Sequence, residues 1–347
     1  MSLASIRSYE RLDLALEPGL VLIVGPNGVG KTNLLEAVHV GSQGFSPRTR
    51  TDAEIVRFGS DAGRISLRGD RAGAPLELEV TLQLRAAKRA KLNGATLRAA
   101  EQLRLQVGAL VFTPDRLAVA KGSPAVRRAY FDRVLGRLTP ARSSLPIEYA
   151  AAVGQRNAAL RRVAAGVSSR EALAPWTERV TTLGAALVET RIETLERLQP
   201  KFERQGEALG LSAAQLQYVG EPPSVPALED RIDRDLERGA TGLGPHLDDI
   251  SIRAGARELR RFGSQGEQRI AVLALLLAEA ELLAERGTPP LLLLDDVLSE
   301  LDAARRAALA ARIRDVGQSL VTATAADALP VDPDQLVEVS PGSARPV

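Results

Sequence analysis

The segment GPNGVGKT, Gly25 to Thr32, contains residue types that bind phosphate. It fits the pattern G-x-x-x-x-G-K-[ST], whose glycines let backbone N–H groups face phosphate oxygens. We expect Lys31 to neutralise β/γ-phosphate charge and the Thr32 hydroxyl to bind Mg²⁺. An apolar strand pattern precedes the motif and a helical pattern follows it, so the segment predicts an ATP site. Its predicted nucleotide contacts are Gly25, Pro26, Asn27, Gly28, Gly30, Lys31, Thr32 and Asn33.

A pair of carboxylates ends the apolar run LLLLDD, residues 291–296. At the end of a buried strand, Asp295 is placed to hold Mg²⁺ through water. Asp296 is placed to orient and deprotonate the attacking water. The alternative is that the pair only caps a sheet, but two adjacent aspartates repel unless a cation compensates them. The pair therefore favours a metal-assisted hydrolytic site.

A second helix with a phosphate-facing start lies more than two hundred residues after the first, in FGSQGEQR. Ser264 is expected to cap this helix and Glu267 to complete a capping box. The N–H groups and positive dipole end of such a helix attract an anion. The candidate contacts are the first residues of this helix, Ser264, Gln265 and Gly266. The alternative is an ordinary capped helix.

The elements around these motifs alternate between strand and helix patterns. Strands are expected at residues 3–9 and 20–25, and a helix at 31–40. Further strands are expected at 64–69, 76–84 and 103–112, with a turn at Asn93–Gly94. Strands at 246–255, 289–297 and 318–324, with a helix from Ala303, complete a predicted α/β sheet. The tail, 341–347, is expected to be loose.

The middle of the chain is predicted to be helical from about residue 121 to Leu209. Ser123 and Pro124 suit a helix start. Trp176, Val180 and Leu187 share a helical face with Leu183. The proline-rich stretch 219–230 is expected to be a connection. Because a chain of 347 residues exceeds the size of most single cores, these helices predict a lobe inserted into the α/β domain.

Composition limits the other possibilities. The chain has no cysteine, which excludes disulfides and thiolate metal sites. It has two histidines, His39 and His246, which are too few for a histidine-rich metal cluster. No apolar run reaches the ~18 residues of a membrane span. The N-terminus has charges where a signal peptide is apolar, so a cytoplasmic protein without a membrane partner is expected. The net charge of +2 means that a nucleic-acid surface would be a local patch.

Two further segments resemble motifs of the ABC-type ATPases: GSQGEQ is similar to their signature, and SELD, Ser299 to Asp302, to their D-loop. In that superfamily the signature helix of one subunit closes over the γ-phosphate held by the P-loop of another. The resemblance implies a head-to-tail, ATP-dependent homodimer with two composite sites, which would explain two phosphate-facing helix starts. It also adds Asp302 to the predicted nucleotide contacts and implies a catalytic role for Ser264.

Within this superfamily the chain resembles the RecF family, through GPNGVGKTNLLEAV, VFTPDRLAVAKGSPAVRRAYFD, TGLGPHLDD, SQGEQR and LLLLDDVLSELD in that order. The resemblance implies an ABC-type P-loop ATPase head, residues 1–115 and 235–347, with a helical lobe at 116–234. It implies slow, DNA-stimulated ATP hydrolysis with Mg²⁺ and double-stranded DNA binding. It also implies action with RecO and RecR in loading RecA at gaps and stalled replication forks.

The chain departs from related ATPases at several positions. Leu247 stands where a basic residue is expected, and no glutamine stands near Thr113. No histidine follows the strand at 318–324, so Thr322 or Thr324 would sense the γ-phosphate. Asp296 replaces a glutamate and is one methylene shorter, which predicts slow turnover.

Three arginine-rich stretches are candidate DNA contacts, although such stretches are more often solvated faces. They are residues 85–98, 127–133 and 257–261. Because aromatic residues are scarce, duplex phosphates are favoured over stacked single-strand bases. Other functions considered are a transporter's nucleotide-binding subunit, a structural chromosome protein and a P-loop kinase. A transporter subunit would have a switch histidine, and a structural chromosome protein would have a long coiled coil; neither is present in the sequence. A P-loop kinase would lack the signature that this sequence has.

Overall fold

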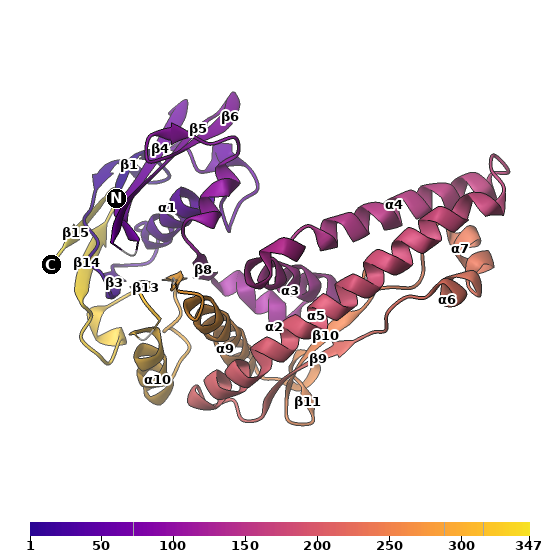
Figure 1. The fold of residues 1–347 in the computed structure, drawn as a ribbon. Helices are drawn as coiled ribbons and strands as arrows, with labels where there is room; N and C mark the ends of the chain where they lie inside the picture. Colours follow the sequence, from indigo (N-terminus) through magenta and orange to yellow (C-terminus); the bar gives the residue numbers. More distant parts are fainter. Residues whose placement is uncertain (72, 288, 315) are drawn as a thin grey trace. The chain divides into compact units, whose positions relative to one another are not determined.

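The computed structural model describes residues 1–71, 73–287, 289–314 and 316–347 (Figure 1). Contacts divide the chain into two compact units, which we call unit 1 (Met1–Arg116 and Leu276–Val347) and unit 2 (Leu117–Leu275). The first boundary lies beside the predicted one at 115/116. The second, after Leu275, lies about forty residues after the predicted 234/235 and falls within helix α9 (Gln265–Ala284). Residues 235–275 group with unit 2 because β10 (Asp249–Ala254) pairs with β9 (Ala214–Val219).

Unit 1 contains two six-stranded sheets. The first is antiparallel, in the order β2-β1-β4-β5-β6-β7. The second has the order β15-β14-β3-β13-β12-β8, and its pairs from β14 to β8 are parallel. The strands of the first sheet are β1 (Ser2–Ile6), β2 (Tyr9–Asp13), β4 (Ala62–Arg71), β5 (Ala74–Gln83), β6 (Ala86–Leu92) and β7 (Ala95–Thr96). Those of the second are β3 (Leu20–Val24), β8 (Ala109–Phe112), β12 (Leu291–Leu294), β13 (Ser319–Ala323), β14 (Gln335–Ser340) and β15 (Ser343–Pro346).

Helix α1 (Lys31–Gln43) contacts strands of both sheets and shares one apolar core with them. Strand β3 is buried at every position, as expected for a parallel strand covered on both faces. The carboxyl ends of β3, β12 and β13 meet at one edge of the second sheet. That edge is where open parallel sheets bind ligands. Helix α10 (Ala303–Arg314) also belongs to this unit, as does the second part of α9 (Gln265–Ala284).

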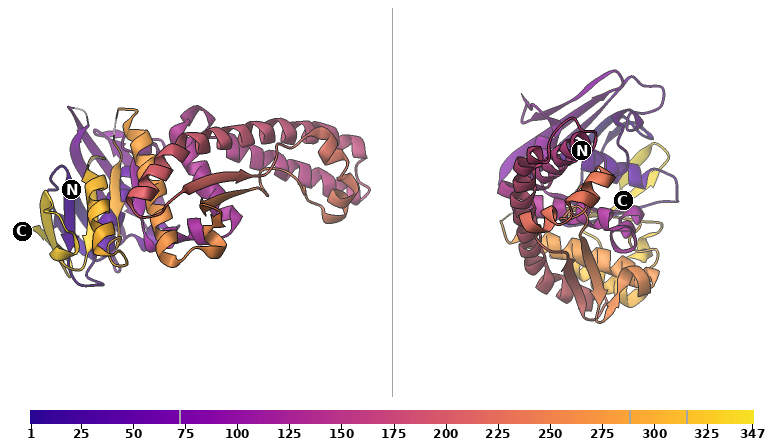
Figure 2. Two further views of the ribbon diagram at one scale, coloured as in Figure 1. Left: turned by 90° about the horizontal axis from the view of Figure 1, so that it is seen from below. Right: turned by 90° about the vertical axis from the view of Figure 1, so that its right-hand side faces the viewer.

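Unit 2 is built on a pair of long helices, α4 (Leu145–Ala164) and α5 (Ala174–Ala208), which pack against each other (Figure 1). Val180 and Leu187 of the predicted apolar face are buried there, and Leu183 packs on the same cluster. The sheet β11-β10-β9 lies along α5 (Figure 2). The other elements are α2 (Ala118–Lys121), α3 (Pro124–Leu138), α6 (Val225–Glu229), α7 (Ile232–Arg238), β11 (Arg257–Glu258) and α8 (Leu259–Phe262).

Four local predictions need correction. The tail is not loose: β15 pairs with β14, which in turn pairs with β3. Of the predicted strand 103–112, residues 109–112 form strand β8. The residues before it form a 3₁₀ turn over Ala100–Leu105, in which the Gln102 side chain accepts hydrogen bonds from the amides of Arg98 and Ala99. The stretch 219–230 contains helix α6. Ser123 stands at the N-cap of α3, but its hydroxyl makes no capping hydrogen bond.

An ion pair and hydrogen bonds within unit 2 hold the segment TGLGPHLDD, residues 241–249, in place. Arg127 donates to both carboxylate oxygens of Asp249, at 2.7 and 2.6 Å. His246 lies 2.8 Å from the Tyr149 hydroxyl, and the Tyr218 hydroxyl donates to Asp248. The side chain of Leu247 is exposed. Arg127, one of the candidate DNA contacts, is therefore a buried structural residue.

A fully buried ion pair in unit 2 joins Arg156 and Asp235, whose side chains are both 0% exposed. We expect Arg156→Met to destabilise the unit by about 3–5 kcal/mol, because the substitution leaves a buried carboxylate without its cation. Trp176 is the only tryptophan and lies in α5, so its fluorescence during urea unfolding reports on this unit. The control is Asp233→Asn, which removes an exposed pair with Arg170 and should change little. An unchanged midpoint for Arg156→Met would contradict the prediction.

Candidate nucleotide-binding site

The predicted phosphate loop connects β3 to α1 at the carboxyl edge of the parallel sheet. Three of its glycines have positive φ angles, 155° at Gly25, 82° at Gly28 and 117° at Gly30. A Cβ at Gly25 would lie 2.5 Å from the Val339 carbonyl oxygen, and one at Gly30 would lie 2.8 Å from the Ser8 hydroxyl. Neither position therefore has room for a side chain. Gly28 faces open space, so only its conformation requires glycine.

Lys31 folds back over this loop. Its ammonium group donates to the carbonyl oxygens of Gly25, at 2.6 Å, and Pro26, at 2.9 Å. Burial lowers the pKa of Lys31, while the nearby carboxylates of Asp295 and Asp296 act in the opposite direction. The ammonium group therefore lies in the mouth of the loop, where phosphate oxygens would take the place of the two carbonyl acceptors.

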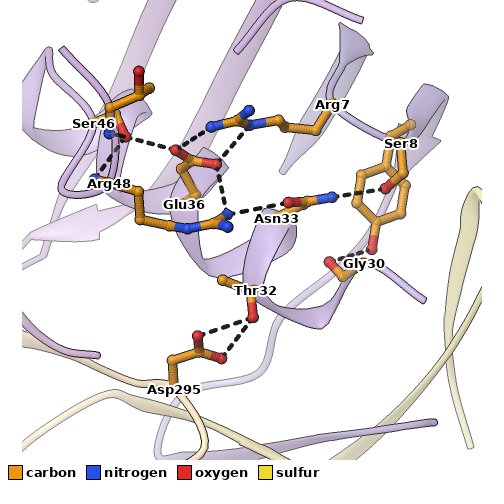
Figure 3. Close-up of polar contacts among 11 residues, drawn as sticks. Arg7, Ser8, Gly30, Thr32, Asn33, Glu36, Ser46, Arg48 and Asp295 are labelled. Carbon is orange, nitrogen blue, oxygen red and sulfur yellow. Dashed lines mark hydrogen bonds and ion pairs between the residues drawn. The ribbon is translucent and has the colours of Figure 1, made fainter. Parts of the chain in front are cut away.

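Thr32 and Asp295 come together although 263 positions separate them in the chain (Figure 3). The Thr32 hydroxyl lies 3.0 and 2.9 Å from the two Asp295 carboxylate oxygens. The Thr322 hydroxyl, from β13, donates to Asp295 at 2.8 Å. Asp295 is 6% exposed, so these two hydroxyls define the position of a nearly buried carboxylate.

Asp296 differs from its neighbour in exposure and in backbone conformation. Its side chain is on the surface, and its φ angle of 49° is in the left-handed region. Its amide donates to the Thr322 hydroxyl at 2.9 Å, and its carbonyl accepts from Ser299 at 3.2 Å. Asp and Asn tolerate this conformation better than most residues. The two adjacent aspartates thus have different environments, one buried beside Thr32 and one facing solvent.

A magnesium ion fits the donors at this edge. Among the residues that the structure describes, no group of three or more His, Cys, Asp or Glu forms a complete metal site. Mg²⁺ typically uses one or two protein oxygens, several waters and substrate phosphates. The Thr32 hydroxyl and the Asp295 carboxylate, directly beside the phosphate loop, match that donor set.

The predicted signature residues lie in unit 2, at the start of α9. The capping box is confirmed: the Glu267 amide donates to the Ser264 hydroxyl at 3.2 Å, and the Ser264 amide donates to the Glu267 carboxylate at 2.8 Å. Hydrogen bonds from Arg257 and from the Ser264 amide lower the pKa of Glu267 to about 2. The cap therefore stays ionised at neutral pH. Arg257 is paired here, which accounts for one cation of the stretch 257–261.

Nothing in the backbone or the packing of unit 2 requires a glycine at position 266. Its φ angle is not positive, and an added Cβ would meet only the Ser264 hydroxyl, at 3.9 Å. Ser264 and Gln265 beside it are exposed. The start of α9 is thus a small, polar surface.

Asp302, a predicted nucleotide contact, has a local role in this chain. Its carboxylate accepts from the Arg305 amide at 2.8 Å and caps α10. It also lies 3.4 Å from the Arg305 guanidinium group. Helix capping by Asp at this position is common and does not by itself indicate a ligand.

Sequence reasoning did not identify several residues that organise the phosphate loop. Tyr9 donates to the Gly30 carbonyl at 3.1 Å, and Ser8 accepts from Asn33 at 3.2 Å. Both lie in or beside the turn between β1 and β2. Thr322, considered as a γ-phosphate sensor, is 1% exposed and holds Asp295 and the Asp296 amide instead. No local motif marks Ser8 and Tyr9, because their role depends on the pairing of distant strands.

Comparison with known proteins identifies the family of this chain. Residues 1–344 match the family described as RecF/RecN/SMC N terminal domain. The chain is 37% identical to the DNA replication and repair protein RecF of Acidothermus cellulolyticus, over 93% of this chain and 92% of that protein. The chain belongs to the RecF family. It is also 35% identical to RecF of Heliobacterium modesticaldum, over 97% of this chain and 94% of that protein.

Solved structures show the same fold. The structure of the recombination mediator RecF with ATP, from the RecFOR pathway, superposes with a TM-score of 0.85 at 25% identity, covering 100% of this chain and 96% of that one. An Smc head bound to the C-winged helix domain of ScpA superposes with a TM-score of 0.61 at 17% identity, covering 100% of this chain and 96% of that one. The predicted ABC-type ATPase head with additional helices is thus confirmed as a fold. In the part of the chain that the structure describes, no helix is long and apolar enough to cross a membrane.

Proposed function

We propose that this RecF family member is an ATP-dependent, double-stranded DNA-binding protein of recombinational repair, in which slow ATP hydrolysis acts as a switch. The observation that carries the proposal is the approach of Thr32 to Asp295 beside a loop whose glycines, Gly25, Gly28 and Gly30, all have positive φ angles. A related RecF has been solved with ATP, which supports ATP as the nucleotide here. By family resemblance, the protein works in the cytoplasm with RecO and RecR to help load RecA at DNA gaps and stalled forks.

In the proposed site the nucleotide phosphates lie on the loop amides, Lys31 and the start of α1. Mg²⁺ is held by the Thr32 hydroxyl and, through water, by Asp295. The ion would neutralise phosphate charge and polarise the γ-phosphate. The exposed Asp296 carboxylate would orient the attacking water and accept its proton. Thr324 is exposed, so it is better placed than Thr322 to sense the γ-phosphate.

We further propose that the start of α9 acts in trans on the nucleotide of a second copy. Ser264, Gln265 and Gly266 would close over the partner's γ-phosphate, with Asp302 near the same interface. The glycine at 266 supports this arrangement, because neither the backbone conformation nor packing within unit 2 requires it. A closely approaching phosphate would require a small residue there. The result is a head-to-tail homodimer with two composite sites.

Analytical ultracentrifugation tests this proposal directly. A non-hydrolysable ATP analogue with Mg²⁺ should convert the monomer to a dimer, and ADP should not.

DNA binding is tested in the same nucleotide states. Binding to a labelled duplex should require the ATP analogue and should exceed binding to the matching single strand. It should also weaken steeply with salt, because duplex binding releases counterions from phosphates. Equal duplex affinity with and without nucleotide would contradict an ATP-dependent clamp.

Asp296→Asn is expected to retain ATP binding and to lower the hydrolysis rate by at least about a hundredfold, the usual contribution of a general base. Asn suits the left-handed backbone at φ 49°, so the substitution removes basicity without adding strain. Single-turnover hydrolysis measures the effect, and a fluorescent ATP analogue measures binding. The control is Asp327→Asn, an aspartate of the same unit outside the site. Wild-type turnover in Asp296→Asn would place the base elsewhere.

A further inference from the structure

A carboxylate just beyond the phosphate loop is almost completely buried. Glu36 follows Thr32 by one turn of α1 and is 2% exposed. Arg7 donates to both of its oxygens at 2.8 Å, Ser46 donates at 2.6 Å and Arg48 at 3.2 Å (Figure 3). Burial favours the protonated form, but the hydrogen bonds from Arg7 and Ser46 outweigh it and lower the pKa of Glu36. The carboxylate is therefore ionised and holds two arginines.

The first arginine connects Glu36 to the turn between β1 and β2. Arg7 has a φ angle of 49°, a left-handed conformation that the ion pair helps to hold. The next residue, Ser8, accepts a hydrogen bond from the Asn33 side-chain amide at 3.2 Å. Tyr9 then donates to the Gly30 carbonyl at 3.1 Å. The turn held by Glu36 therefore contacts the last part of the phosphate loop on both sides of Lys31.

The second arginine reaches the same asparagine from the opposite direction. Arg48 donates from one nitrogen, Nη1, to Glu36 at 3.2 Å and to the Asn33 carbonyl oxygen at 3.3 Å. The Asn33 amide thus has its nitrogen toward Ser8 and its oxygen toward Arg48 (Figure 3). Both partners of Asn33 named here are connected to Glu36: Arg48 donates to it directly, and Ser8 follows Arg7, which also donates to it.

We propose that Glu36 is a positioning residue for the nucleotide site, acting on Asn33 through Arg7 and Arg48. This inference rests on the proposed nucleotide site and deepens it, since Glu36 itself faces the arginines and not the phosphate loop. Asn33 follows Thr32 directly, and its orientation is coupled to the first turn of α1, whose amides would face phosphate. Loss of a fixed Asn33 orientation and of the β1–β2 turn conformation would weaken nucleotide binding and leave the chemical step unchanged.

The charge of Glu36 is essential to this role. Glutamine has nearly the same shape, but it cannot accept from Arg7 with both terminal atoms and leaves two neighbouring guanidinium groups without an anion. The arginines would then repel each other and turn toward solvent. Arg48 is already part-exposed, with a side chain 38% exposed, so it is the partner expected to leave first.

The test is Glu36→Gln in the full chain, measured with a fluorescent ATP analogue and by steady-state ATPase assay. ATP affinity should fall about tenfold, which corresponds to one lost hydrogen bond to a charged group. KM should rise by a similar factor while kcat at saturating ATP stays unchanged. The matched control is Glu77→Gln, which removes an exposed pair with Arg68 in the same unit and should leave KM unchanged.

Two further variants keep the proposal falsifiable. Arg48→Gln lies nearer the surface and should lower ATP affinity even if Glu36→Gln does not fold. Adding Asn33→Ala to Glu36→Gln should cost little more than Asn33→Ala alone, because both act through one side chain. Unchanged affinity in folded Glu36→Gln or in Arg48→Gln, or fully additive effects in the double variant, would overturn the inference. Failure of the wild-type chain to bind ATP would instead overturn the nucleotide site itself.

Discussion

Lys31→Ala is expected to reduce ATP binding to background. Lys31 is the side-chain cation in the mouth of the phosphate loop, where its ammonium group donates to the carbonyl oxygens of Gly25 and Pro26. Without it, bound phosphates would keep the loop amides but lose their main charge partner. The loop itself should survive, because the hydrogen bond from the Tyr9 hydroxyl to the Gly30 carbonyl does not involve the lysine.

Equilibrium titration with a fluorescent ATP analogue in the presence of Mg²⁺ measures this effect. Lys91→Ala is the matched control, since it removes a lysine of the same unit that pairs with Glu79 on the antiparallel sheet. Circular dichroism and the thermal midpoint should be close to wild type for both variants. Undiminished affinity in Lys31→Ala would count decisively against the phosphate-loop assignment.

Ser264→Arg is expected to abolish ATP-dependent dimerisation while each copy still binds ATP. Ser264 is exposed at the start of α9, where it forms the capping box with Glu267. An arginine there would place a bulky side chain where the partner's γ-phosphate must approach. Its charge would attract phosphate, but steric exclusion should dominate because well-packed interfaces tolerate little added volume. Hydrolysis and ATP-dependent duplex binding should be lost together.

Ser264→Ala separates the steric effect from loss of the cap. It removes the capping hydroxyl, at a cost of about 1 kcal/mol, without adding volume. We expect this variant to dimerise weakly and to retain part of its ATPase activity. If Ser264→Ala and Ser264→Arg were equally inactive, the defect would lie in the helix cap and not in closure over a phosphate.

Mixing Ser264→Arg with Lys31→Ala tests action in trans. The mixed dimer has one composite site that carries both defects and one that carries neither. Partial ATPase activity should therefore reappear on mixing, although each parent is inactive. Sedimentation of the mixture must accompany the assay. If the two sites can act only together, the mixed dimer would form but show no activity. Neither dimer nor activity in the mixture, with both parents folded, would contradict the trans arrangement.

Local patterns predicted much of the site. The spacing of Gly25, Gly30, Lys31 and Thr32 locates the phosphate loop, and Ser264 with Glu267 predicts the capping box that the structure shows. These features depend on residues within a few positions of one another. The apolar run before Asp295 is likewise a strand, β12. The roles of these residues with nucleotide remain predictions.

Predictions were wrong where distant segments decide the outcome. The tail looks loose because it is short and contains glycine and proline, but β15 gains a partner in β14 and so joins the parallel sheet. The connection at 219–230 contains a short helix, whose start is capped by Ser224. The choice between Thr322 and Thr324 as γ-phosphate sensor stayed open in the sequence, and parallel pairing of β13 with β12 places the Thr322 hydroxyl beside Asp295.

Short-range spacing thus located the phosphate loop, the Asp295–Asp296 pair and the capped helix start. The order of several motifs along the chain indicated the family and the α/β fold class. The folded chain was needed to show which of the two aspartates is buried, which hydroxyls hold it and how Glu36 connects Arg7, Arg48 and Asn33. These contacts form because strand pairing brings together residues up to hundreds of positions apart. Hydrogen bonds between such residues have no periodicity or spacing that a linear pattern can reveal.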